Sequence, residues 1–188
     1  MQEILNKATY GVLAVCSNNT PYAIPLNFVY FNNCFYFHGS KKGKKIDILK
    51  SNKKASFSVV NEASLIPSYF SSKNNLACPA TQFFSSVIAN GVVEFVDSYK
   101  EKVDALTALM QKLQNESGYK SLNSSEYSSA INATTIYKLI VKEFTIKEKY
   151  GQKLPHNRLK MIIDSLQKRE TQVDRFTISK IKEFRNDI

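Results

Sequence analysis

The pattern of hydrophobic and polar positions predicts that strands dominate the first 150 residues. Residues 11–16 form a continuous apolar run, residues 34–38 are rich in aromatic side chains, and residues 55–60 alternate with a period of two. Aromatic and β-branched side chains suit the half-buried surface of a pleated sheet. We predict six strands, which span residues 11–16, 22–31, 34–38, 55–60, 81–96 and 134–147.

The second of these strands, residues 22–31, is interrupted by Pro25. Proline has no N–H to donate to a neighbouring strand, so Pro25 marks an edge, a bulge or a place where the backbone faces a ligand. Asn32-Asn33 predicts a tight turn into the third strand. We expect the first three strands to form an antiparallel meander, and we expect Gly91 to form a bulge in a later strand.

Apolar residues at helical spacing predict helices between and after the strands. Val103, Leu106 and Leu109 would form one face of a helix, and Ser98 with Glu101 would form a capping box at its start. Two further helices are predicted after Pro155. The longest predicted loops are rich in Ser and Asn, and they span residues 61–79 and 115–129.

This order of elements indicates a mainly β protein with helices, of the α+β class. Antiparallel hairpin steps with helices inserted between them are typical of a small β-barrel decorated by helices. We therefore expect a six-stranded antiparallel barrel domain over residues 1–150 and a C-terminal helical extension over residues 151–188.

One polar segment between a predicted strand and a predicted helix is chemically distinctive. This lysine turn reads His38-Gly39-Ser40-Lys41-Lys42-Gly43-Lys44-Lys45. A helix N-terminus carries partial positive charge and favours acidic side chains nearby, yet this helix begins with Lys44 and Lys45. An anion bound among the free backbone N–H groups, Ser40 and the lysines would resolve that conflict. The lysine turn thus predicts a phosphate site, and a solvated lysine face is the alternative.

The charge balance of the chain supports an anionic ligand. The formal net charge is +10 and the pI is about 9.4. Residues 41–54 contain seven lysines and one acidic residue, whereas residues 155–188 contain eight basic and five acidic residues. The excess therefore belongs mainly to the lysine turn and its helix, and nucleic acid is not expected as a partner.

Several classes of site are not expected from this sequence. The cysteines, Cys16, Cys34 and Cys78, are odd in number and widely spaced, which argues against a disulfide framework and a zinc site. No paired carboxylates, Ser-His-Asp set or metal cluster stands out, so metal catalysis and hydrolysis are not predicted. The N-terminus lacks a signal-peptide pattern and no apolar stretch is long enough to span a membrane, so a cytoplasmic protein is expected.

Several motifs occur in a recognisable order along the chain. They are Gly11-Val12-Leu13-Ala14, Pro21-Tyr22-x-x-Pro25-Leu26-Asn27-Phe28-Val29-Tyr30, Tyr36-Phe37-His38-Gly39-Ser40, Gly43-Lys44-Lys45-Ile46-Asp47, Ser58-Val59-Val60, Ser85-Ser86-Val87-Ile88-x-x-Gly91 and Glu101-Lys102. In this order they resemble the pyridoxamine phosphate oxidase-like flavoproteins over roughly residues 5–150, and they are most similar to the nitroimidazole-resistance (Nim) branch.

The resemblance implies a split β-barrel that binds FMN at a homodimer interface. Ser40, Lys44 and Lys45 would hold the FMN phosphate, and His38 would lie near the flavin or the phosphate end as a candidate catalytic residue. The other implied cofactor-binding residues are Gly39 in the lysine turn, Pro25, Leu26 and Asn27 against the isoalloxazine ring, and Ser85 and Ser86, which could reach the cofactor of the partner subunit.

These implications lead to an FMN-dependent oxidoreductase as the first functional hypothesis. Its substrates would be nitroaromatic or other small electron acceptors, and a nicotinamide cofactor is a possible electron donor. The Arg-rich substrate clamp of a true pyridoxamine phosphate oxidase is not evident, so vitamin B6 oxidation is not expected. Two alternatives stay open: a flavin-binding regulator without enzymatic activity, and a haem-binding or haem-degrading split barrel with His38 or His156 near the iron.

Overall fold

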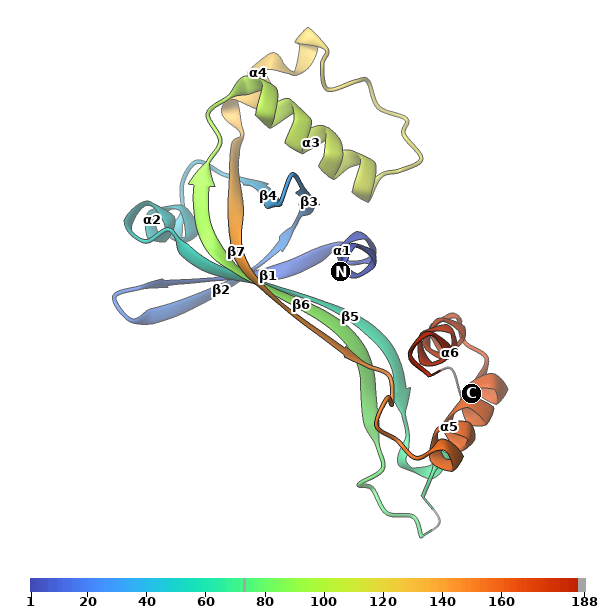
Figure 1. Cartoon of the computed structure of the whole chain (residues 1–188). Coiled ribbons are helices and arrows are strands. Elements are labelled where there is room, and N and C mark those ends of the chain that lie inside the picture. Colours follow the sequence, from blue (N-terminus) through green and yellow to red (C-terminus); the bar gives the residue numbers. More distant parts are fainter. Residues whose placement is uncertain (73, 186–188) are drawn as a thin grey trace. The chain divides into compact units, whose positions relative to one another are not determined.

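The computed structural model describes residues 1–72 and 74–185. The chain forms two compact units (Figure 1). The barrel unit comprises residues 1–59 and 87–145, and the C-terminal unit comprises residues 60–86 and 146–188. The predicted helical extension, residues 151–188, lies within the C-terminal unit.

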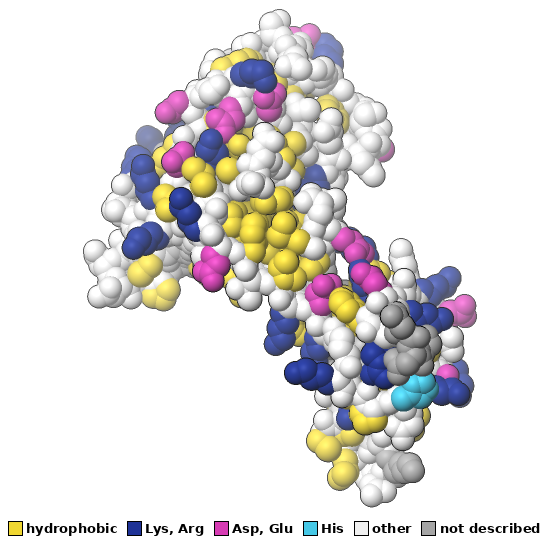
Figure 2. Space-filling view, in the orientation of Figure 1, with side chains coloured by type: hydrophobic (Ala, Val, Ile, Leu, Met, Phe, Trp, Pro, Cys, Tyr) yellow, Lys and Arg dark blue, Asp and Glu magenta, His cyan; other side chains and the backbone are white. Residues whose placement is uncertain are grey.

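Both units carry basic side chains on their surfaces (Figure 2). None of the helices in the described part of the chain combines the length and the apolar character needed to cross a membrane. The cysteines Cys16, Cys34 and Cys78 are free thiols.

The strands of the structure exceed the predicted number. The elements of the barrel unit alone are α1 (Gln2–Lys7), β1 (Tyr10–Ser17), β2 (Thr20–Asn27), β3 (Val29–Phe31), β4 (Cys34–Gly39), α2 (Lys44–Ser51), α3 (Tyr99–Leu113), a 3₁₀ turn (Ser125–Tyr127) and α4 (Ser128–Ala133). Three strands have residues in both units, and they are β5 (Lys54–Ile66), β6 (Thr81–Phe95) and β7 (Thr135–Lys149). The C-terminal unit adds a 3₁₀ turn (Ser68–Phe70), α5 (His156–Arg169) and α6 (Gln172–Phe184).

The seven strands form one sheet in the order β2-β1-β5-β6-β7-β4-β3. β1 pairs with β2 and with β5, and β4 pairs with β3 and with β7, all antiparallel. β2 and β3 lie at opposite ends of this order, yet only Phe28 separates them in the chain. The two ends of the sheet must therefore meet at Phe28, which closes the sheet into a barrel.

The mainly β, antiparallel prediction is confirmed, but six strands and a simple three-strand meander are wrong. Residues 22–31 form two strands because Phe28 and Val29 are both buried. Neighbouring side chains of a regular strand point to opposite faces, so two consecutive buried residues require the chain to bend. β2 then pairs with β1, and β3 pairs with β4 through a tight turn at Asn32 and Asn33, both with positive φ.

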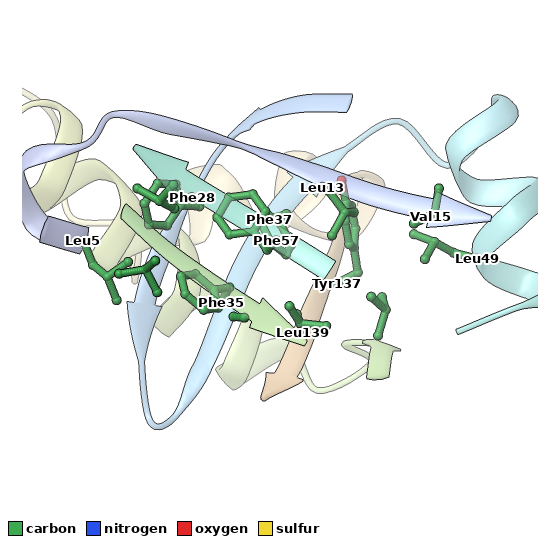
Figure 3. Packing of buried hydrophobic residues seen from close by; sticks show 14 of the residues in the cluster. Leu5, Leu13, Val15, Phe28, Phe35, Phe37, Leu49, Phe57, Tyr137 and Leu139 are labelled. Carbon is green, nitrogen blue, oxygen red and sulfur yellow. The ribbon is translucent and has the colours of Figure 1, made fainter. Parts of the chain in front are cut away.

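An aromatic cluster fills the barrel (Figure 3). The Phe57 ring is central, with ring centroids 5.1 Å from Phe28, 5.1 Å from Phe35 and 4.9 Å from Phe37. A Cβ atom on Gly11 would lie 2.6 Å from Phe57 Cζ, so only glycine lets β1 approach this closely. Packing of these rings contributes to the apolar burial inside the barrel together with aliphatic residues such as Leu13 and Leu139.

Gly91, the predicted bulge, lies on β6 against the backbone of β7 at Ile140. A Cβ atom at this position would overlap the carbonyl oxygen of Ile140. The close approach of the β7 backbone therefore requires glycine at this position. An isolated glycine in a strand usually marks either a bulge or such a close approach.

Helix α3 begins as predicted at Ser98, but its capping box is only half formed. The Ser98 hydroxyl accepts a hydrogen bond from the Glu101 N–H at 3.4 Å. The Glu101 carboxylate instead accepts bonds from the Tyr36 hydroxyl at 2.9 Å and from Lys138 Nζ at 2.6 Å, which lowers the pKa of Glu101. Glu101 thereby ties α3 to β4 and β7.

Lys112, near the end of α3, supports the bend at Phe28. Its Nζ donates a hydrogen bond to the Phe28 carbonyl oxygen at 3.0 Å and lies 3.4 Å from the centroid of the Phe28 ring. Burial lowers the pKa of Lys112 to about 8. Lys112 thus holds Phe28, the residue between β2 and β3, through both its ring and its carbonyl group.

The C-terminal unit contradicts the predicted loop over residues 61–79, because β5 continues to Ile66 and Ser68–Phe70 form a 3₁₀ turn. Two helices, α5 and α6, bury one face each, with the buried residues Leu159, Ile162, Ile163, Leu166 and Ile181. These helices confirm the prediction that Pro155 opens a helical segment.

A buried carboxylate, Asp174, joins α6 to β5 in the C-terminal unit. Asp174 is 0% exposed, and its carboxylate accepts bonds from Arg169 at 2.5 Å and from the Ser64 hydroxyl at 2.6 Å. The Thr171 N–H donates a further bond at 3.1 Å within a capping box. The pKa of Asp174 lies well below its usual range, mainly because of the Arg169 guanidinium and to a smaller extent because of these hydroxyl and N–H donors.

Replacing Asp174 with Asn should destabilise the C-terminal unit by about 2–3 kcal/mol, because charge-assisted bonds are lost and Arg169 loses its partner. Since the pKa of Asp174 is lower in the folded chain, the stabilisation is complete above the ordinary carboxyl pKa of about 3.9 and declines as the pH falls below it. Urea denaturation at several pH values measures both effects. Asp164→Asn on the exposed face of α5 is the control, and equal stabilities of the two variants would contradict the prediction.

Lys112 should make stability depend on pH in the alkaline range. From about pH 8 to about pH 10.4 the folded chain has released the Lys112 proton while the unfolded chain still holds it, so the free energy of unfolding rises with pH. Because Lys112 keeps part of its water, we expect a gain on the order of 1–2 kcal/mol. Lys112→Met should remove that gain, and parallel pH curves for the two proteins would refute this assignment.

Candidate functional site

The lysine turn leads from the end of β4 into α2, and its backbone is arranged for an anion. Gly43 precedes the helix with a φ of 120°, a conformation that side chains disfavour, and no side chain caps the helix. The N–H groups of Ile46 and Asp47 bond to the Gly43 carbonyl oxygen. In the described residues the N–H groups of Lys44 and Lys45 have no protein acceptor, so they remain for a ligand.

Ser40 shapes the turn before the helix. Its hydroxyl oxygen accepts a hydrogen bond from the Lys42 N–H at 3.2 Å, and the residue is exposed. The hydroxyl hydrogen is thus directed away from Lys42, where it can serve as a donor to an anion.

Lys45 turns back over the end of β4. Its Nζ lies 3.1 Å from the place where a Cβ atom on Gly39 would stand, and 5.0 Å from the ring centroid of Tyr137. Glycine at position 39 therefore makes room for the ammonium group. Burial lowers the pKa of Lys45, and within residues 1–72 and 74–185 no carboxylate forms an ion pair with it.

His38 lies beside this lysine, opposite Ile136 in the β4–β7 pairing. Partial desolvation lowers the pKa of His38, and the nearby charge of Lys45 lowers it further. The imidazole is therefore neutral at neutral pH and can both donate and accept a hydrogen bond.

Tyr137 is a site residue that the sequence analysis missed. It lies on β7 opposite Phe37, is 0% exposed, and stacks on the Phe37 ring at 5.4 Å. Among buried side-chain polar atoms of the described residues, its hydroxyl oxygen is the one without a hydrogen-bond partner. Burial raises the pKa of Tyr137, so the group is a neutral phenol below Lys45. An aromatic residue in a strand pattern carries no sequence signal for such a role.

The two lysines at the start of α2 point to different places. Lys44 Nζ lies 4.4 Å from the ring centroid of Tyr22 on β2, whereas Lys45 lies over Tyr137 on β7. An anion at the N-terminus of α2 would draw both ammonium groups toward it only if the exposed Lys44 side chain moved from Tyr22.

A basic cavity borders the lysine turn within the barrel unit. Its volume is about 380 Å³, and Lys41, Lys50 and Lys102 contribute to its lining together with Asp97 and Thr135. Three cations and one carboxylate give this cavity a positive potential. Lys102 comes from α3, far from the lysine turn in sequence, so only the fold brings it here.

The predicted flavin-facing residues lie on β2, at one end of the sheet order. Pro25 therefore lies on a strand at an end of the sheet order, which agrees with the edge, one of the three predicted possibilities. Leu26 packs against the aromatic cluster, whereas Pro25 and Asn27 are exposed. The Asn27 amide donates a hydrogen bond to the Thr9 carbonyl oxygen at 3.0 Å, so it also fixes the start of β1.

Ser85 and Ser86 belong to the C-terminal unit and not to the barrel unit. The buried Ser85 hydroxyl bonds to the Tyr150 hydroxyl at 2.7 Å and donates to Glu148 at 3.4 Å. His156 is the first residue of α5 in the same unit and is exposed. Within the barrel unit, the structure brings together His38, Gly39, Ser40 and Lys45.

The family model for pyridoxamine 5'-phosphate oxidase matches residues 1–148 of this sequence. The chain belongs to this family. A comparison with curated proteins finds no match. The pyridoxamine 5'-phosphate oxidase family assignment confirms the resemblance found in the motifs, and the split-barrel fold of the family fits the closed sheet described above.

Solved structures share the fold at low sequence identity. A candidate 5-nitroimidazole antibiotic resistance protein from Bacteroides thetaiotaomicron is 23% identical with a TM-score of 0.62, covering 77% of this chain and 80% of that one. An FAD and haem binding protein from Mycobacterium smegmatis is 16% identical with a TM-score of 0.61, covering 78% and 68%. The flavocytochrome Anf3 from Azotobacter vinelandii is 20% identical with a TM-score of 0.60, covering 79% and 65%. At these identities the similarity establishes the fold alone.

If the Tyr137 hydroxyl is an unsatisfied donor in the ligand-free protein, Tyr137→Phe should raise the free energy of unfolding by about 1 kcal/mol, because a buried polar group without a partner is removed. The matched control is Tyr150→Phe, which loses the bond to Ser85 and should lower the free energy of unfolding by about 1 kcal/mol. Urea denaturation without ligand measures both. Equal destabilisation by the two substitutions would mean that the Tyr137 hydroxyl already has a partner.

Proposed function

We propose that this protein is an FMN-dependent oxidoreductase that reduces nitroaromatic or other small electron acceptors. The observation that carries the proposal is the Lys45 ammonium group, which is partly desolvated and lies beside an uncapped helix N-terminus. A phosphate there would accept bonds from the helix N–H groups and compensate the buried charge. The family assignment and the flavin proteins of the same fold support FMN as the bearer of that phosphate.

When bound, FMN supplies reversible electron transfer, and this chain's residues bind and orient it. Lys45, Ser40 and the first N–H groups of α2 would hold the phosphate, while Lys44 would leave Tyr22 to join them. The neutral His38 imidazole, at the end of β4, can accept a proton at its free ring nitrogen and return it. Pro25 and Asn27 would face the ring from the outer surface of β2.

A homodimer with the cofactor at its interface is part of the proposal. The outer face of β1 is apolar, with Tyr10 62% exposed and Val12 38% exposed, and Val12 lies opposite Pro25 in the β1–β2 pairing. Ile88 on β6 is 40% exposed. Burial of such side chains against a second copy would exclude water beside the predicted ring-binding strand. The substrate and a nicotinamide electron donor would enter where the interface leaves the ring accessible.

An absorption spectrum of the protein after reconstitution tests the cofactor, with FMN and haem added separately. Flavin bands that stay with the protein after gel filtration are expected. A Soret band instead of flavin bands would replace this proposal with a haem protein, and flavin binding without reduction of nitroaromatic compounds by a nicotinamide donor would favour a flavin-binding regulator. If neither FMN nor haem stays with the protein after reconstitution, the proposal is refuted.

Lys45→Ala should weaken FMN binding by about 10- to 100-fold, because a charge-assisted bond to phosphate is worth about 1.5–3 kcal/mol. Lys45→Ala combined with Lys44→Ala should abolish FMN retention. Quenching of flavin fluorescence during titration measures the affinity. Lys53→Ala is the control, because this exposed lysine carries the same charge outside the lysine turn. If Lys45→Ala and Lys53→Ala weaken binding equally, general electrostatic attraction and not the lysine turn holds the phosphate.

A further inference from the structure

The C-terminal unit contains a cavity with no assigned ligand. Its volume is about 640 Å³, which lies in the range of small-molecule sites. The lining comes from residues 78–81 and 83 around the start of β6, residues 147–149 of β7, and residues 151–154 and 158 at the start of α5 and just before it. It shares no residue with the lysine turn, so it is a separate candidate site.

The inner wall of this cavity is apolar and fixed in shape. Gly151 adopts a φ of 79°, and a Cβ atom there would meet Leu159 at 2.9 Å, Leu154 at 3.1 Å and Phe83 at 3.2 Å. These side chains therefore close tightly around the glycine backbone. Phe83 is 1% exposed, so its ring is part of the packed core that backs the cavity. A ligand with an apolar body would find a preformed surface here.

The cavity is also strongly basic. Lys147, Lys149, Lys153 and Arg158 line it, and Glu148 is the one acidic residue among the lining residues. A net positive lining beside an apolar wall favours an anion over a neutral or cationic ligand.

Two of these cations are held in place by neutral groups. Arg158 Nε donates to the Ser71 hydroxyl at 3.2 Å, and Arg158 Nη2 donates to the Pro79 carbonyl oxygen at 3.2 Å. Lys149 Nζ donates to the Thr81 hydroxyl. Neutral acceptors orient the side chains but leave their positive charges uncompensated, so a ligand anion can still pair with them.

We propose that this cavity binds a small organic anion, with a carboxylate or a phosphate group paired to Arg158 and Lys149 and an apolar body against the wall that includes Leu154. The guanidinium of Arg158 is oriented before the ligand arrives, which lowers the entropy cost of binding. The proposal is independent of FMN at the lysine turn, since it rests on residues of the C-terminal unit alone.

The probe for this site is 1-anilinonaphthalene-8-sulfonate, whose aromatic body and single negative charge match the proposed ligand. Fluorescence titration of the full chain should show saturable binding that weakens with salt. Phenyl phosphate and benzoate should displace the probe, and the stronger competitor identifies which anionic group the site prefers. Benzyl alcohol, which lacks the charge, should compete at least about tenfold more weakly. Equal competition by benzyl alcohol would overturn the recognition of an anion.

Arg158→Gln and Lys153→Gln should each weaken probe binding at least about fivefold, because each removes one positive charge from the lining. Lys153 is exposed, so its substitution keeps the test valid if Arg158→Gln fails to fold. The control is Lys168→Gln, which removes one exposed charge from α5 outside the cavity and should change affinity by less than about twofold. The proposal would be overturned if the probe bound Lys153→Gln as tightly as the unmodified protein. The same result in a folded Arg158→Gln variant would overturn it as well.

Cys78 gives an independent readout of where the probe binds. Its exposed thiol lies among the lining residues, whereas Cys34 is buried. Bound probe should slow alkylation of Cys78 by iodoacetamide at least about threefold, as measured by mass spectrometry of the modified peptide. If the probe binds but leaves the alkylation rate of Cys78 unchanged, it occupies another site and the assignment is wrong.

Discussion

The barrel depends on a chain connection of one residue. Phe28 alone joins β2 to β3, the strands at opposite ends of the sheet, so the sheet cannot lie open. Its ring packs against Phe57, and its carbonyl group and ring both contact Lys112 of α3. The bend therefore combines an aromatic core with a polar contact from a helix. A closed sheet also leaves fewer unpaired strand edges to associate with other chains.

The pairing of β4 with β7 produces the arrangement at the lysine turn. Because β4 pairs with β7 in register, Gly39 lies opposite Thr135 and Phe37 lies opposite Tyr137. Lys45 can then reach back from α2 over Gly39 to the Tyr137 ring. An uncapped helix, a desolvated cation and a buried hydroxyl without a partner are each costly alone. A phosphate at the helix N-terminus would relieve the first two costs, which is why we regard the lysine turn as a binding site.

The charges of this protein fall into two groups with different physical roles. Carboxylates such as Glu101 and Asp174 bind their cations closely and join one element to another. Lys45 and Arg158, in contrast, contact rings or neutral acceptors and keep their charge uncompensated. Part of the net charge of +10 therefore lies where it can attract anions, because these cations are not neutralised by carboxylates.

The sequence by itself determined the features that depend on near neighbours along the chain. Most strand positions, the helix after Ser98, the helices after Pro155, the lysine turn and the family follow from local patterns, and the structure or the family model agrees, apart from the strand over residues 22–31 and the loop over residues 61–79. Tertiary structure alone decided the features that depend on distant partners. Phe28 splits a strand because core packing and sheet closure override alternation, and Glu101 leaves its cap because β7 presents Lys138. The burial of the Tyr137 hydroxyl without a hydrogen-bond partner is likewise set by non-local packing, which no local pattern encodes.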